Sequence, residues 1–106
     1  EYARQYTGTI NVSLGEEKTV AKISVVLKYS YTDSRVVISS FSCTQTYIKN
    51  GNKISIEKKE IQNGNPAIAS VRYTATNPAA GQSRTFIAYF AVGTNGDVRT
   101  QIYPLN

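Results

Sequence analysis

The sequence predicts an all-β domain made of two antiparallel sheets packed face to face, a two-sheet sandwich of about seven strands that is immunoglobulin-like in the broad sense. Apolar and polar residues alternate with a period of two over several segments, and no comparable run has a helical period. Asn-Gly steps at Asn50, Asn63 and Asn95 indicate tight turns. Tyr, Thr, Ile and Val are plentiful, whereas Met, Trp and His are absent.

The whole chain, residues 1–106, is expected to form a single β-sandwich domain. A length of 106 residues is ordinary for one domain, and neither a linker nor a repeat divides the sequence. A chain of this length buries roughly two thirds of the surface that its unfolded form exposes, so it can build a core without metal or disulfides. Alternating strands also build small barrels, and a small β-barrel is the alternative architecture.

The first two strands are predicted to form a hairpin around the turn residues 15–18. The first covers residues 4–14 and interleaves apolar with hydroxyl side chains. The second, Thr19 to Tyr31, is the clearest strand of the chain, because one of its faces is entirely apolar. That face consists of Ile23, Val25, Leu27, Tyr29 and Tyr31.

The third strand follows the turn at residues 32–35, and its pairing with the second can be argued from the residues. If Leu27 faces Phe41, then Val25 faces Cys43, and apolar side chains meet. A slip by one residue would place serines opposite both aliphatic residues. Burial of apolar area favours the first register, so we expect a connecting loop with an odd number of residues. Phe41 and Cys43 should then be buried.

The remaining strands are predicted from turn signals and alternation. Asn50-Gly51 predicts a hairpin into a strand at residues 53–61, whose charged inward positions are typical of an edge strand. A short helical turn at residues 57–62 is the alternative there. Residues 77–83 form the longest stretch without predicted structure, and a last hairpin is expected at residues 94–97. The last three strands are expected at residues 67–76, 84–93 and 98–103.

The residue types argue against catalysis. Without His, a serine or cysteine triad lacks its usual base and imidazole zinc sites are excluded, while the single thiol cannot hold a metal. Cys43 shares the inward parity of Phe41, which favours a packing role over a nucleophilic one. The seven carboxylates lie at turns, at the terminus or on the expected edge strand. We therefore expect no enzyme activity, no catalytic residues, no metal site and no cofactor.

The charge pattern argues against two further classes of partner. The formal net charge is +5, but the basic residues are scattered, and the adjacent pair Lys58-Lys59 is flanked by Glu57 and Glu60. Nucleic-acid binding would require cations gathered on one face, so no nucleic-acid partner is expected. No run approaches the roughly 18 apolar residues of a membrane span, so no span is expected either.

The eight tyrosines are the one enrichment that points to binding. Four of them fall on inward parities, where a structural role is favoured: Tyr29, Tyr31, Tyr47 and Tyr73. The segment at residues 84–93 differs, because it is apolar on both parities and belongs inside a sheet with both faces covered. A patch around Ile87, Tyr89 and Ala91 is therefore the candidate interface.

The Tyr-rich alternating strands, the Asn-Gly turns and the final GTNGDV hairpin are similar to small secreted bacterial domains of unassigned function. We expect a non-catalytic extracellular binding or adhesion module whose partner is a protein or a surface glycan. The start at Glu1-Tyr2 without an initiator Met fits a signal peptide that has been removed, and hence an extracellular or cell-surface location. A small protein inhibitor that acts through loops such as residues 77–83 is the alternative. Oligomeric state and sheet order stay open.

Overall fold

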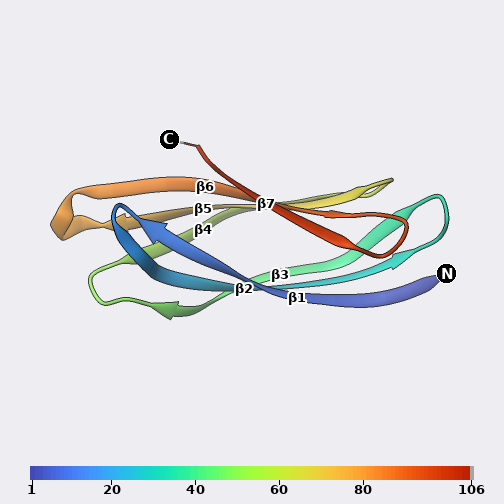
Figure 1. Cartoon of the computed structure of the whole chain (residues 1–106), viewed down its shortest axis with the longest axis horizontal. Helices are drawn as coiled ribbons and strands as arrows, with labels where there is room; N and C mark the ends of the chain where they lie inside the picture. Colours follow the sequence, from blue (N-terminus) through green and yellow to red (C-terminus); the bar gives the residue numbers. More distant parts are fainter. Residues whose placement is uncertain (106) are drawn as a thin grey trace.

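Seven strands make up nearly all of the computed structural model, which describes residues 1–105 apart from the side chain of Glu17. The chain runs from blue to red in Figure 1. The elements in order are β1 (Tyr2–Leu14), β2 (Glu17–Tyr31), β3 (Val36–Ile48), β4 (Lys53–Gln62), β5 (Ala67–Asn77), the 3-10 helix η1 (Pro78–Ala80), β6 (Gln82–Val92) and β7 (Val98–Pro104).

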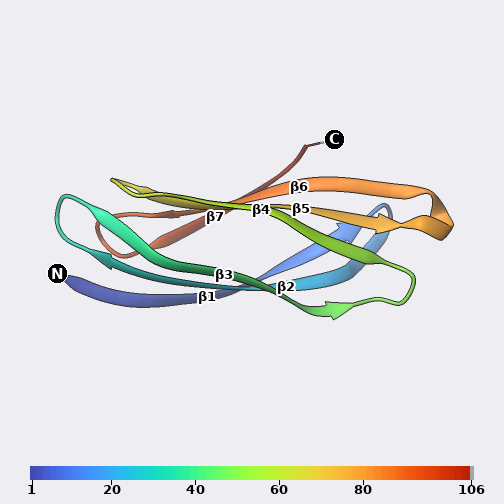
Figure 2. The same ribbon diagram turned by 180° about the vertical axis from the view of Figure 1, so that it is seen from behind.

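The strands form two antiparallel sheets that lie face to face, as Figures 1 and 2 show from opposite sides. The three-stranded sheet has the order β1-β2-β3 and the four-stranded sheet the order β4-β5-β6-β7. The predicted two-sheet sandwich is confirmed, and the sheets do not close into the alternative barrel. Consecutive strands pair within each sheet, so the likeness to immunoglobulin domains stops at the layered architecture and does not include their Greek-key connections.

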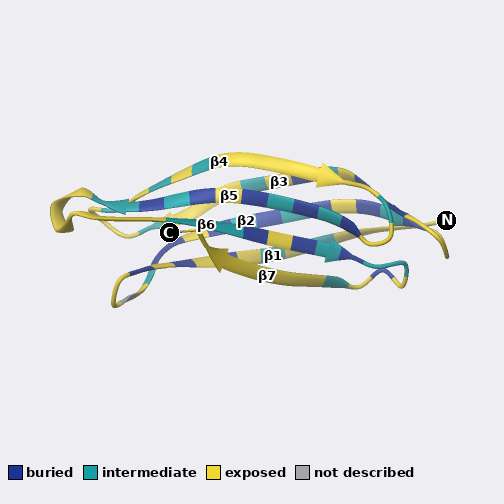
Figure 3. Ribbon diagram, turned by 90° about the horizontal axis from the view of Figure 1, so that it is seen from above, coloured by how far each residue is buried: buried dark blue, intermediate teal, exposed yellow. Residues whose placement is uncertain are grey.

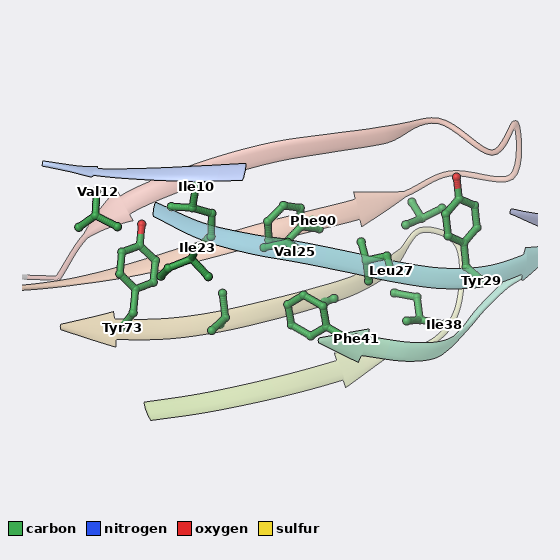
Figure 4. Close-up of a cluster of buried hydrophobic side chains, with 14 of the residues drawn as sticks. Ile10, Val12, Ile23, Val25, Leu27, Tyr29, Ile38, Phe41, Tyr73 and Phe90 are labelled. Atoms are coloured by element: carbon green, nitrogen blue, oxygen red, sulfur yellow. The ribbon is translucent and has the colours of Figure 1, made fainter. Parts of the chain in front are cut away.

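The core lies between the two sheets and is built from the inward positions of their strands. Phe41 of β3 and Phe90 of β6 meet across the interface, with ring centroids 5.9 Å apart (Figure 4). The inward face predicted for β2 is buried along its length, which confirms the central position of that strand. The largest fully buried side chains are Tyr73, Phe90, Ile10, Ile23, Leu27, Val12, Val20, Val25, Val36, Val71 and Val92.

The predicted pairing of β2 with β3 is confirmed at its centre. Leu27 lies opposite Phe41 and Val25 lies opposite Cys43. Phe41 is buried as expected. Cys43 is only half-buried, which corrects the prediction of a buried thiol, because β3 is an edge strand whose inner face is covered less completely there.

The loop between β2 and β3 has an even number of residues, 32–35, so the expected odd length is wrong. Tyr31 pairs with Val36, and the register then shifts by one where Ser39 is left without a partner in the ladder. Such a bulge reverses the parity of every residue on one side of it. Val36 is therefore buried and Val37 exposed, while the pairs at the centre of the strand keep the predicted register.

A second register shift in β3 corrects the inward placement of Tyr47. Thr46 has no partner in the ladder, so Tyr47 pairs with Lys22, an outward residue of β2. The ring is exposed, and the Lys22 ammonium lies 6.0 Å from its centroid. The other tyrosines predicted to face inward are buried, as expected: Tyr29, Tyr31 and Tyr73.

The turn at Asn50-Gly51 forms, but it does not make the predicted hairpin. It carries the chain from β3 of one sheet to β4 of the other, and the Lys49 N–H donates to the Val20 carbonyl at 2.7 Å. Gly51 adopts φ +87°, a conformation that favours glycine. Turn chemistry specifies a reversal of the chain, whereas tertiary packing decides whether the two strands bond to each other.

β3 and β4 consequently lie as neighbouring edges of opposite sheets. Val36 and Gly64 exchange two backbone hydrogen bonds of 2.7 and 3.1 Å. The Lys59 ammonium donates to the Phe41 carbonyl at 3.2 Å. These contacts hold the two sheets together along one side of the sandwich.

β4 is an edge strand, as predicted, and the alternative helical turn does not form. A bulge at Glu57 explains its poor alternation, because Ile56 pairs with Tyr73 while Lys58 already pairs with Arg72. Residues 77–83 are more ordered than expected, since the β5–β6 ladder continues to the pair Asn77 and Gln82. The connection that remains is η1, where the Asn77 side chain accepts the Ala80 N–H at 3.2 Å.

Candidate functional site

The candidate site is the outer face of the four-stranded sheet, which Figure 3 views from above. β5 and β6 form its centre, and β4 and β7 form its edges. The register sets outward residues in rows across the four strands. Taken from β4 to β7, these rows are Lys58, Arg72, Ile87, Tyr103; Glu60, Ser70, Tyr89, Gln101; and Gln62, Ile68, Ala91, Arg99.

The predicted residues Ile87, Tyr89 and Ala91 alternate along β6 and lie together on this face. β6 is an interior strand, as its apolar character on both parities indicated. Within residues 1–105 no other element packs on the outer face, so Tyr89 is 36% exposed and the other two are partly exposed. The predicted interior position of β6 is therefore confirmed, whereas no described element supplies the cover that was expected on its second face.

Two further residues extend this group and were missed by sequence reasoning. Ile68 of β5 pairs with Ala91, and Tyr103 of β7 pairs with Ile87. Tyr103 is 47% exposed, and its ring contacts that of Tyr89 edge to face at a centroid distance of 6.0 Å. The pairing register of β5, β6 and β7 was the signal that could have found them. We call the five residues the outer patch: Ile68, Ile87, Tyr89, Ala91 and Tyr103.

Charged side chains border the outer patch on the β4 side. The Lys58 ammonium contacts the Glu60 carboxylate at 2.8 Å, and this hydrogen bond lowers the pKa of Glu60 below its ordinary value. Together with Ser70, Arg72 and Ile87 they line a small hollow of about 130 Å³. This side of the patch therefore offers charges of both signs beside an aliphatic side chain.

A larger hollow of about 520 Å³ opens at the other end of the patch, where two loops meet. The β4–β5 connection and the β6–β7 turn form its walls, while Ala91 and Arg99 belong to the strands. The sequence did not predict it, because its walls come from distant parts of the chain. Its lining residues are Asn65, Pro66, Ala91, Gly93, Thr94, Asn95, Asp97 and Arg99.

The β6–β7 turn, predicted as a hairpin and present as one, is held in a fixed position. The Asn95 side chain accepts the Asp97 N–H at 3.1 Å and donates to the Asp97 carboxylate at 3.0 Å. The Tyr29 hydroxyl, from the other sheet, donates to the Gly96 carbonyl at 2.7 Å. Burial raises the pKa of Tyr29, so this hydroxyl keeps its proton and remains a donor at neutral pH. The wall of the larger hollow is thus fixed to both sheets.

The groups considered for catalysis do not converge on this face. Burial raises the pKa of the Cys43 thiol to about 11, an effect that Lys59 partly offsets, so the thiol stays protonated at neutral pH. The six carboxylates whose side chains are described are all exposed. Among the described side chains, no three from Cys, Asp or Glu gather closely enough to hold a metal ion.

None of the described elements is a helix with the length and apolar character needed to cross a membrane. Comparisons of the chain with protein-family models, with curated proteins and with solved structures find no match. The candidate site therefore rests on the residues and the geometry of this chain.

Proposed function

We propose that the protein is a non-catalytic binding or adhesion module that presents the outer patch to a partner protein. The observation that carries the proposal is the exposure of Ile87, Tyr89 and Tyr103 on a face that no described element covers. Outward positions of antiparallel strands are ordinarily polar, so the architecture alone does not require these side chains. Tyrosine is enriched at the energetic centres of protein interfaces, where it offers a large and rather rigid surface.

The surroundings of the patch support a protein partner. Arg72 and Arg99 lie in the rows of Ile87 and Ala91, so guanidinium groups border an apolar centre. An apolar centre with a polar rim is the usual organisation of protein interfaces. The rows run across a sheet rather than into a deep cleft, which suits a broad partner surface better than a small molecule.

A surface glycan is the second candidate partner, and the larger hollow is the observation that favours it. Asn65, Asn95 and Asp97 place amide and carboxylate groups around it, and Arg99 adds a guanidinium. Such groups exchange hydrogen bonds with sugar hydroxyls, and the Tyr89 ring on the same face offers a stacking surface. The inhibitor alternative gains less support, because β5 and β6 reduce the loop at residues 77–83 to the short helix η1 and its caps.

An extracellular, bacterial origin belongs to the same proposal. Its support is the composition, which is rich in Ser, Thr and Tyr and free of His. Detection of the native protein in the culture medium or on the cell surface, compared with the cell interior, tests this part. Recovery only inside cells would contradict it.

The binding proposal is tested with one matched pair of variants. Ile87→Asp places a charge in the outer patch, and Val26→Asp places the same charge on the outer face of β2, the central strand of the other sheet. Both positions are half-buried and both strands are interior, so the two changes perturb folding comparably. Binding is screened on a glycan array and against a displayed library of surface proteins, and thermal unfolding confirms that each variant folds.

We expect Ile87→Asp to weaken binding at least about tenfold, while Val26→Asp leaves it within about twofold. Equal losses in both variants would contradict the assignment of the site. Failure to find any ligand, combined with reproducible turnover of a substrate, would contradict the function itself.

A further inference from the structure

β7 is the outermost strand of the four-stranded sheet, and within residues 1–105 no strand pairs with its free side. Its residues, Val98 to Pro104, pair with β6 in a continuous antiparallel register without a bulge. The unpaired N–H and C=O groups of such an edge form a template onto which another strand can add.

The flanking hydrogen bonds determine which backbone groups face the free side. At the two ends of the β6–β7 ladder, the Gly93 N–H donates to the Asp97 carbonyl at 3.1 Å and the Leu105 N–H donates to the Thr85 carbonyl at 2.8 Å. Bonded positions recur at every second residue of an antiparallel pair. The residues that bond to β6 are therefore Arg99, Gln101 and Tyr103. The residues that present both backbone groups to the free side are Val98, Thr100 and Ile102.

The inner face of the four-stranded sheet is also uncovered at this edge. Thr100 pairs with Phe90 and Ile102 pairs with Ala88, so all four lie on the inward parity. Phe90 and Ala88 are buried, yet Thr100 is exposed and Ile102 is 43% exposed. The four-stranded sheet therefore extends beyond the three-stranded sheet at β7, which Figure 3 shows as exposed along most of its length.

The edge strands on the opposite side of the sandwich, β3 and β4, are protected against pairing with another strand, and β7 is not. β4 has a bulge and carries Lys58, Lys59 and Glu60. β3 has two register shifts, and part of its backbone bonds to Lys59 and Gly64. Bulges and charged side chains are the usual means by which natural sheets prevent edge-to-edge pairing. β7 has one charged residue, Arg99, and its proline lies at its last position.

We propose that β7 pairs antiparallel with β7 of a second copy of this chain, with the two-fold axis at Thr100. Thr100 then faces Thr100 of the second copy, and Val98 faces Ile102 of the second copy. In this register every free-side N–H of β7 meets a carbonyl, because all the facing positions belong to the set that presents its backbone outward. The result is one continuous sheet made from the four-stranded sheets of both copies.

The side chains of β7 favour a copy of itself as the occupant. Val98 and Ile102 form two apolar cross-strand pairs on the uncovered inner face, and facing threonines form a favourable pair at the axis. Arg99 faces Gln101 of the second copy, so like charges are not set opposite each other. An axis at Gln101 would set Val98 against Pro104 and separate it from Ile102. The interface is isologous, as expected for a two-fold dimer.

Pairing through β7 does not rest on the proposed function, because it is measured without any ligand. Analytical ultracentrifugation over a wide range of protein concentration is expected to give twice the monomer mass of 11.7 kDa at high concentration. Thr100→Pro removes one free-side N–H and leaves the bonds to β6 intact, so it should raise the dimer dissociation constant at least about tenfold. Thr100→Ala, the matched control, keeps the N–H and is expected to dimerise.

A wild-type protein that stays monomeric at every concentration would overturn the proposal, as would a Thr100→Pro variant that dimerises as well as Thr100→Ala. If Thr100→Pro does not fold, Ile102→Lys replaces it, since that position is exposed in the monomer and the change places a charge on the edge. This variant should be monomeric, and a dimer of undiminished strength would contradict pairing through β7.

The register is tested by oxidative cross-linking in a Cys43→Ser background, which removes the native thiol. Thr100→Cys lies on the proposed axis, so its thiol faces the same thiol of the second copy and should form a disulfide. Gln101→Cys lies one residue away on the opposite face and should not cross-link. Cross-linking of Gln101→Cys alone would overturn the register.

Discussion

The outer face of the three-stranded sheet and the outer face of the four-stranded sheet arise from the same alternation, yet they carry different side chains. On the three-stranded sheet the central rows consist mostly of hydroxyl and lysine side chains: Gln5, Lys28, Ser40; Thr7, Val26, Ser42; and Thr9, Ser24, Thr44. On the four-stranded sheet the corresponding positions include the outer patch. The first face shows that an outer face of this sandwich can be polar, so the layered architecture alone does not explain the apolar exterior of the second.

Shape alone does not distinguish the two faces. The three-stranded sheet also carries a hollow, of about 340 Å³, whose lining includes Lys28, Ser30 and Ser39. The rest of its lining is Ala3, Arg4, Gln5 and Tyr29. Tyr29 belongs to the buried core, so alanine is the one exposed apolar side chain that borders this hollow. The chemistry of the outward residues, rather than concavity, therefore locates the candidate site.

The largest expected effect is the loss of stability when an inward residue of β6 is truncated. It distinguishes the inward positions of that strand from its outward positions. Phe90 is 2% exposed and contacts the rings of Phe41 and Tyr6 from the opposite sheet. Phe90→Ala should lower the free energy of unfolding by about 3–5 kcal/mol, because it removes buried surface and leaves a cavity. Urea denaturation monitored by circular dichroism measures the change. A loss below about 1 kcal/mol would show that the sheets do not pack on this ring.

The next effect tests whether the three-stranded sheet stabilises the β6–β7 turn of the four-stranded sheet. Tyr29→Phe deletes the buried hydrogen bond to the Gly96 carbonyl and should lower the free energy of unfolding by about 1–2 kcal/mol. Amide exchange at Asp97 should accelerate because the turn is less firmly held. Tyr2→Phe, at an exposed ring, is the control and should change neither quantity. Unaltered amide exchange in Tyr29→Phe would show that the three-stranded sheet does not stabilise the turn.

A smaller effect is expected when the outer patch itself is altered. Tyr89→Ser removes an exposed ring and its edge contact with Tyr103, and should lower the free energy of unfolding by less than about 1 kcal/mol. Ser24→Ala, on the opposite exterior, should change it by less than about 0.5 kcal/mol. Thermal and urea unfolding compare the two variants. If Tyr89→Ser cost as much as Phe90→Ala, the patch would be part of the stabilising core and not a free surface.

The smallest effect at neutral pH concerns Cys43 at the edge of β3, because its thiol is protonated there in both the folded and the unfolded state. Its pKa is raised from an ordinary 9.0 to about 11, so the folded state holds the proton more tightly than the unfolded state. This contribution to stability is complete below pH 9.0 and is lost as the pH rises to about 11. Stability should therefore fall slightly less steeply over this range in Cys43→Ser than in the wild type. Thiol labelling of the folded protein should be slow at neutral pH, with a midpoint near pH 11; rapid labelling would contradict the half-buried thiol.

The features that could be predicted from the sequence are those encoded locally. Alternation of period two gave the fold class and the strands, and apolar pairing gave Leu27 opposite Phe41. The bulges at Ser39, Thr46 and Glu57 could not be predicted, because an unpaired residue in a ladder has no distinctive side chain. Each one reverses parity, and this is why the loop length and the position of Tyr47 were wrong.

The candidate site was predictable along β6 and not across the sheet. Ile87, Tyr89 and Ala91 stood out because one strand was apolar on both parities. Ile68 and Tyr103 join them only through the register with β5 and β7, and the larger hollow exists only because two distant turns meet. The hairpin predicted at Asn50-Gly51 is wrong for the same reason. The assignment of a strand to a sheet depends on long-range packing, which turn chemistry does not encode.

The sequential strand order has a consequence for how the molecule assembles. Residues 2–48 supply one sheet and residues 53–104 the other, so every ladder joins strands that are neighbours in the chain. Closing such short loops costs little entropy, and each half can fold its ladder before the two halves dock. Cleavage within residues 49–52 would therefore leave two fragments, each containing a complete sheet, that reassemble through the core without a covalent link.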